Sequence, residues 1–205
     1  MLLLLILVAA SPPLDSPRPL LPHEFVGTLG PFRPQSGAWV EYLVRSRGEQ
    51  DVRVRLAVLP PVAGDGRAWI EVTTVGARSL PFAARLLLNV GTGKLERASV
   101  YALGQAPIEL PVGEADGATR AAAPLVRVVN AHAKAIRVAA GTFTATELHV
   151  GQGGAAARVW RSNEVPLWGM VRAESGGRTV ELLRYGGGGA SSVFPQGKGS
   201  ENANE

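Results

Sequence analysis

The 205-residue sequence contains no cysteine, which excludes a range of structures and chemistry. Disulfide bonds, thiolate metal sites and cysteine nucleophiles are impossible, and so is a lipid anchor on a cysteine. The folded chain must therefore be stabilised by packing and hydrogen bonds alone. Charged residues are also few, at 19%, whereas 46% of the residues are hydrophobic. This balance is typical of a chain that buries a core, and it argues against wholesale disorder.

The motifs that mark common catalytic sites are missing as well. No G-x-S-x-G nucleophile elbow occurs, and the segment NVGTGKLE (89–96) lacks the glycine spacing and the Ser or Thr of a phosphate loop. The three histidines, His23, His132 and His149, lie far apart and form no metal-ligand pair. We therefore predict no catalytic residues, no metal and no cofactor, and we expect the protein not to be an enzyme.

The net charge of +4 and the pI near 10.0 are basic, but the basic residues are not concentrated. Arginines such as Arg53, Arg55 and Arg158 are scattered along alternating segments, without a basic run. Nucleic-acid binding normally requires a clustered basic stripe with stacking aromatics. We therefore expect no nucleic-acid partner, and at most a peripheral contact with an anionic membrane surface.

The two ends of the sequence differ from its middle. Residues 1–10 combine a short apolar run with small residues, and Ala10 fits the position before a signal-peptide cleavage site. The prolines of residues 11–24 predict an extended spacer. The glycine-rich residues 186–205 are expected to be disordered. A curved β domain is therefore predicted over 25–185, in a secreted protein that is periplasmic or extracellular.

The middle of the sequence alternates between apolar and polar residues with a period of two, which indicates β-strands. Short glycine-containing turns separate the alternating segments and favour antiparallel neighbours. The alanine-rich stretch 114–131 is ambiguous and leaves a short helix open. The pattern predicts a mainly β fold with little helix, built as a strongly curved antiparallel sheet or half-open barrel. Strands are expected near 38–46, 51–58, 68–75, 83–89, 95–102, 134–139, 143–150, 156–161, 167–174 and 178–185.

Parity along the strands places all four tryptophans, Trp39, Trp69, Trp160 and Trp168, on the more polar face. An indole in such a position can cover the rim of a core while its N–H contacts water. Alternatively, the four indoles and Met170 line a groove for an apolar ligand, because binding pockets are mostly apolar with a few polar groups. These five residues are the candidate binding site.

Two segments resemble a family of secreted bacterial proteins that is grouped as a domain of unknown function. AAGTFTATEL (139–148) is similar to the P-A-G-T-F-x-A turn of that family, although Ala139 stands where proline is usual. WRSNEVPLWGMVR (160–172) is similar to its W-x-S-x-x-V-P-x-x-G-x-V segment, and NVGTGKLER (89–97) to an earlier hairpin. The matched positions of the first two segments are Gly141, Thr142, Phe143, Ala145, Trp160, Ser162, Val165, Pro166, Gly169 and Val171.

The resemblance implies the lipoprotein-carrier architecture, which is a half-open barrel of curved antiparallel sheet with an apolar hollow. It transfers no catalytic residue. Within the two segments, Gly141 is expected to allow a tight hairpin that Phe143 anchors. Pro166 is expected to hold the preceding residue extended before a strand resumes at Leu167. Gly169 is expected to mark a bend or a close backbone approach in that strand.

Three functional hypotheses remain open. The first is an exported, non-enzymatic envelope protein that binds a lipid or a lipid-modified partner in the hollow of the sheet. The second is an envelope scaffold or protein-interaction module without cargo, which a filled sheet interior would favour. A hydrolase with an unfamiliar site is a remote third, because no nucleophile–base pair is recognisable.

Overall fold

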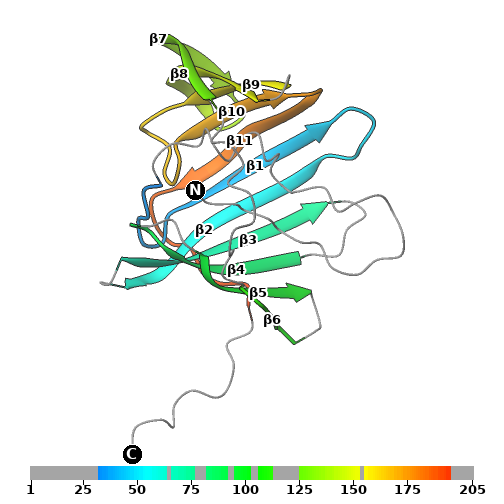
Figure 1. The fold of residues 1–205 in the computed structure, drawn as a ribbon, viewed down its shortest axis with the longest axis vertical. Coiled ribbons are helices and arrows are strands. Elements are labelled where there is room, and N and C mark those ends of the chain that lie inside the picture. Colours follow the sequence, from blue (N-terminus) through cyan, green and yellow to red (C-terminus); the bar gives the residue numbers. More distant parts are fainter. Residues whose placement is uncertain are drawn as a thin grey trace, which may run out of the picture.

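The computed structural model describes residues 32–63, 66–76, 82–91, 95–102, 106–112, 125–152 and 155–194. These residues form one antiparallel sheet of eleven strands and no helix (Figure 1). The mainly β, curved antiparallel fold predicted from the alternation is confirmed. In this described part of the chain, no helix is long and apolar enough to cross a membrane. The predicted signal peptide and spacer lie outside the described residues.

The strand order shows two meanders that meet in the middle of the sheet. The strands are β1 (Trp39–Ser46), β2 (Val52–Ala63), β3 (Arg67–Gly76), β4 (Phe82–Asn89), β5 (Leu95–Ala102), β6 (Ile108–Leu110), β7 (Leu125–Val138), β8 (Gly141–Gln152), β9 (Ala155–Arg161), β10 (Met170–Ser175) and β11 (Arg178–Gly186). In space their order is β6-β5-β4-β3-β2-β1-β11-β10-β9-β8-β7. We call β1–β6 the first meander and β7–β11 the second meander. They join where β1 pairs with β11, as the blue and orange strands of Figure 1 show.

One face of the sheet carries the core, as a period of two predicts for a one-sided sheet. Val40 on β1, Leu56 on β2, Ile70 on β3 and Leu182 on β11 are almost completely buried on this core face. These side chains belong to one continuous apolar cluster. The side chains in the middle of the core face are therefore shielded from solvent. We call the opposite face, which carries most of the charged residues, the outer face.

The second meander contains a strand that the sequence left ambiguous. Residues 125–131 belong to β7 rather than to a helix, because β7 pairs along its length with β8. The rest of the ambiguous stretch lies outside the described residues.

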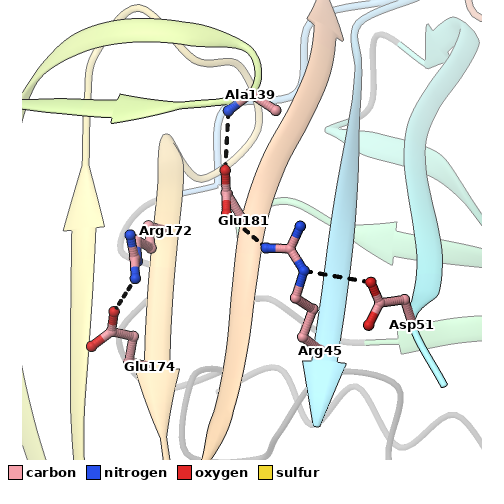
Figure 2. A network of polar contacts seen from close by, with 6 residues as sticks. All are labelled: Arg45, Asp51, Ala139, Arg172, Glu174 and Glu181. Atoms are coloured by element: carbon pink, nitrogen blue, oxygen red, sulfur yellow. Dashed lines mark hydrogen bonds and ion pairs between the residues drawn. The ribbon is translucent and has the colours of Figure 1, made fainter. Parts of the chain in front are cut away.

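The tip of the β7–β8 hairpin returns to β11. The Ala139 N–H donates to the Glu181 carboxylate at 3.0 Å, and the Ala140 N–H donates to the Leu182 carbonyl at 3.2 Å. Figure 2 shows the first of these bonds, with Arg45 paired to the same carboxylate. Gly141 follows the turn with φ 136°, and Phe143 is buried in the apolar cluster. A hairpin is thus present at Gly141, and Phe143 packs in the core beside it.

The glycine-rich tail is packed on the sheet through Phe194, which corrects the expectation that it is disordered from residue 186 onward. The Ala190 N–H donates to the Gly37 carbonyl at 2.9 Å, and Phe194 is 5% exposed. Where this tail begins, Gly186 leaves room for the Trp39 side chain: a Cβ on Gly186 would lie 2.5 Å from Nε1 of Trp39. Because Gly186 has no side chain, the Trp39 indole can lie close to the backbone there. Residues 195–205 lie outside the described part of the chain.

Candidate functional site

The loop between β9 and β10, residues 162–169, is held by its own backbone and by Arg33. The Arg33 N–H donates to the Leu167 carbonyl at 2.9 Å, and the Ser162 N–H donates to the Gly169 carbonyl at 2.8 Å. Leu167 has φ 62° and Gly169 has φ 74°, so both lie in the left-handed region that favours glycine. A strand does not resume at Leu167 as expected; it begins at Met170.

Gly169 makes the close backbone approach that its position suggested, but not within a strand. A Cβ at this residue would lie 2.6 Å from the Ser162 carbonyl oxygen. No side chain can be placed there without a shift of the backbone.

Trp168 is buried in the core rather than on the polar face where parity placed it. Its side chain is 7% exposed and packs against Phe32, with ring centroids 4.9 Å apart. The physical reason is the left-handed conformation of Leu167, which breaks the alternation on which the parity argument depends. Pro166 precedes this break and accepts the Gly169 N–H through its carbonyl at 3.2 Å.

The other three tryptophans lie half-buried on the outer face beneath arginine side chains. The guanidinium of Arg55 is 5.1 Å from the Trp39 ring, and that of Arg158 is 5.3 Å from the Trp160 ring. The Trp69 ring has two such neighbours, Arg85 and Arg97, each at 5.8 Å. This arrangement agrees with indoles that cover the rim of the sheet.

Met170 completes the predicted five-residue groove, and it lies in the core. It is 1% exposed, and its carbonyl accepts a hydrogen bond of 3.1 Å from the Tyr42 hydroxyl. Trp168 and Met170 therefore belong to the core, whereas Trp39, Trp69 and Trp160 lie on the outer face. The structure does not bring the five residues together.

A cleft of about 600 Å³ lies between β8, the end of β9 and the β9–β10 loop. Ala133, Thr144, Thr146 and Leu148 form one side of the cleft. The other side consists of Arg33, Arg161 and the loop residues 162–164. The sequence argument missed this site, although one signal was available. Arg161 stands two residues after the buried Val159, so it occupies a core-face position of the strand.

The two arginines give this cleft an excess of positive charge over the one carboxylate that also lines it, that of Glu164. Arg161 donates through Nε to the Trp168 carbonyl at 3.0 Å, and Arg33 donates through Nη2 to Oδ1 of Asn163 at 3.1 Å. Burial, together with the charge of Arg33, lowers the pKa of Arg161. Among the described residues, neither guanidinium forms an ion pair with a carboxylate. A bound anion would therefore be stabilised here by charge-assisted hydrogen bonds.

A second cleft, of about 480 Å³, lies beside the β10–β11 turn, and it is lined by the charged residues Arg158, Glu174 and Arg178. Arg178 donates to the Ser46 hydroxyl at 3.1 Å. Arg158 forms an ion pair with Glu174, and Arg172 forms another with the same carboxylate at 2.5 Å, as Figure 2 shows for Arg172. His149 lies 2.6 Å from Glu147. The hydrogen bond from His149 is the main reason that the pKa of Glu147 is lowered. No cluster of potential metal ligands occurs in the ranges given above.

No protein-family model and no curated protein matches the sequence. Among solved structures, the chain is similar to the crystal structure of MucB in complex with MucA(peri), with 11% sequence identity and a TM-score of 0.46. The similarity covers 80% of this chain and 55% of that chain, so it spans about half the length of the solved protein. These comparisons show no family. The resemblance of the two sequence segments to a secreted family stays a prediction.

Proposed function

We propose that this protein is an exported, non-enzymatic binding protein of the cell envelope, and that its ligand is a lipid with an anionic headgroup. The observation that supports this best is the pair of guanidiniums, Arg33 and Arg161, at the cleft between β8 and the β9–β10 loop. A headgroup anion would offset the repulsion between the two cations. It would also add a charged partner to Arg161, whose Nε already donates to the Trp168 carbonyl.

The remaining walls of the cleft suit the neutral part of such a ligand. Leu148 and Ala133 offer apolar surface, and Thr144 and Thr146 add methyl groups beside hydroxyl donors. The volume of about 600 Å³ is within the range of roughly 300–1,000 Å³ typical of small-molecule sites. The signal-like residues 1–10 support export, to the periplasm or the exterior.

A continuous apolar cluster with almost no solvent exposure on the core face favours a second candidate, an envelope protein-interaction module without cargo. In that function the cleft would take up no lipid, and a protein partner would bind the sheet surface. Direct titration of lipid separates the two candidates.

The test is calorimetric titration of the full chain with short-chain phosphatidylglycerol below its micelle concentration. Short-chain phosphatidylcholine and inorganic phosphate are the parallel ligands. We expect phosphatidylglycerol to bind, and Arg33→Gln to weaken it by about tenfold, the loss typical of a hydrogen bond to a charged group. Arg45→Gln is the matched control, because Arg45 is a half-exposed arginine of the outer face that pairs with Glu181.

Three results would count against the proposal. Equal affinity for phosphatidylglycerol and phosphatidylcholine would exclude recognition of the anion. Phosphate binding as tight as that of the lipid would reduce the site to a simple anion site. Absence of binding by all three ligands would favour the interaction module.

A further inference from the structure

The carboxylate of Glu71 is buried on the outer face of the sheet, where a carboxylate would ordinarily meet water. Glu71 lies on β3 and is 1% exposed. The covering group is the chain's own tail. The Ser192 hydroxyl donates to Oε2 of Glu71 at 2.5 Å, and the Val193 N–H donates to Oε1 at 2.9 Å. A buried carboxylate needs such partners, because an unpaired one would be strongly destabilising.

Arg85 completes the contact from the neighbouring strand β4. Its Nη2 donates to the Ser192 hydroxyl oxygen at 2.5 Å, and its guanidinium lies 4.6 Å from the Phe194 ring. The ring of Tyr101 on β5 is 5.6 Å from the same phenylalanine. Three adjacent strands thus contribute one side chain each to a seat that holds residues 192–194.

The seat formed by Glu71, Arg85 and Tyr101 makes contact with some parts of the tail but not with others. It contacts a hydroxyl at position 192, a backbone N–H at position 193 and an aromatic ring at position 194. The side chain of Val193 is not part of the contact, since Val193 is 49% exposed. The recognised pattern is therefore a hydroxyl residue, any residue and an aromatic residue.

The link between β11 and the seated residues has little to hold it in place. Gly187, Gly188 and Gly189 are exposed. Along this stretch, Gln35 donates to the Gly187 carbonyl at 2.8 Å, and the Ala190 N–H donates to the Gly37 carbonyl. Glycine backbone can rotate at low steric cost. The tail can thus leave the seat without removing any residue of the sheet's core.

We propose that Glu71, Arg85 and Tyr101 form a peptide-recognition site, that residues 190–194 occupy it in cis, and that a partner protein with a hydroxyl–any–aromatic segment displaces them. This inference is independent of the lipid cleft, which is lined by residues of the second meander and by Arg33. A tethered occupant competes at an effective concentration of about millimolar. An added peptide should therefore bind weakly to the parent chain. It should bind more tightly to a variant whose tail no longer occupies the seat.

The experiment uses the full chain with Ser192→Ala and Phe194→Ala, which removes both side-chain contacts of the tail. The probe is the capped peptide Ala-Ser-Ser-Val-Phe, followed by fluorescence anisotropy of an attached dye. We expect at least tenfold tighter binding to the double variant than to the parent, because the tethered tail of the parent competes with the peptide at an effective concentration of about millimolar. A peptide with lysine in place of valine should bind equally well, and one with alanine in place of phenylalanine should not bind. Adding Glu71→Gln to the double variant should abolish binding.

Failure of the peptide to bind the folded double variant would overturn the proposal, and so would equal affinity for parent and double variant. Loss of binding by the lysine peptide would overturn the recognised pattern. Circular dichroism first establishes that the double variant is folded. If it is not, Ser192→Ala alone replaces it, with the same expected order of affinities. Hydrogen exchange in β3 and β4 of the parent, with and without excess peptide, then shows whether the seat itself is occupied.

Discussion

The two meanders use the same alternating pattern with different results. In the first meander the core-face residues Val54, Leu56 and Ile70 are almost fully buried. In the second meander Val159 continues the core, but Arg161, the next core-face residue of its strand, faces a cleft. The comparison teaches that a single charged residue at a core-face position can mark where packing stops and space for a ligand begins.

The largest effect that separates the meanders should come from truncating a core leucine. Leu56→Ala in the first meander should lower the free energy of unfolding by about 2–5 kcal/mol, since it leaves a dry cavity. Leu148→Ala in the second meander should cost about half as much, because the space it leaves opens into the cleft. Urea unfolding of both variants measures the difference. Equal losses would mean that the two faces are packed alike.

A smaller effect should distinguish two glycines that share a left-handed backbone. Gly48 has φ 79° and a Cβ there would meet nothing within 4 Å, whereas at Gly169 it would meet the Ser162 carbonyl oxygen. Gly48→Ala thus measures conformational strain alone, about 1 kcal/mol. Gly169→Ala should cost a further 1–3 kcal/mol, roughly the cost of overpacking. The readout is again the urea midpoint, and coincident midpoints would contradict the close approach.

A hydrogen bond that links the two meanders should contribute less to the free energy of unfolding than these packing contacts do. The Tyr42 hydroxyl on β1 donates to the Met170 carbonyl on β10 at 3.1 Å. Burial raises the pKa of Tyr42, so the hydroxyl stays a donor throughout the neutral range. Tyr42→Phe should lower the free energy of unfolding by about 1 kcal/mol, as for a typical hydrogen bond. Tyr185→Phe, at an exposed tyrosine of β11, is the control that should change little.

The smallest effect concerns the paired charges of the second meander. The pKa of Glu147 lies below its ordinary value of 4.5 in the folded protein. Its contribution to stability is therefore present above pH 4.5 and is lost as the pH falls through the lowered pKa. Glu147→Gln should reduce the fall in unfolding free energy between pH 6 and pH 3 by about 0.5 kcal/mol. An unchanged fall would show that His149 does not stabilise this carboxylate.

The strands of the sheet could be predicted closely because alternation is a local property of the sequence. The β4 and β5 ranges, for example, agree with the structure to within one residue. The start of β10 could not be predicted, since Leu167 adopts a left-handed conformation where it bridges to Arg33, a residue far away in the sequence. The local alternation of apolar and polar residues does not depend on such a tertiary contact, so it cannot predict one.

The candidate sites were less accessible to sequence reasoning. Arg33 and Arg161 meet only because the chain preceding β1 bridges to the β9–β10 loop. The tail was mistaken for a disordered segment because composition treats glycine as a source of flexibility. At Gly186 glycine instead provides room for the Trp39 indole. Composition does not distinguish these two uses.

The junction of β1 and β11 also determines the order in which the sheet can fold. Within each meander, neighbouring strands are consecutive in the chain, so their hairpins form by closing short loops. The pairing of Trp39 with Gly186 closes a far longer loop and bears a larger entropic cost. We therefore expect this pairing to form late, when both meanders already exist. Because the tail continues directly from Gly186, this pairing also brings Phe194 close to Arg85, and we expect the burial of Phe194 to accompany this late step.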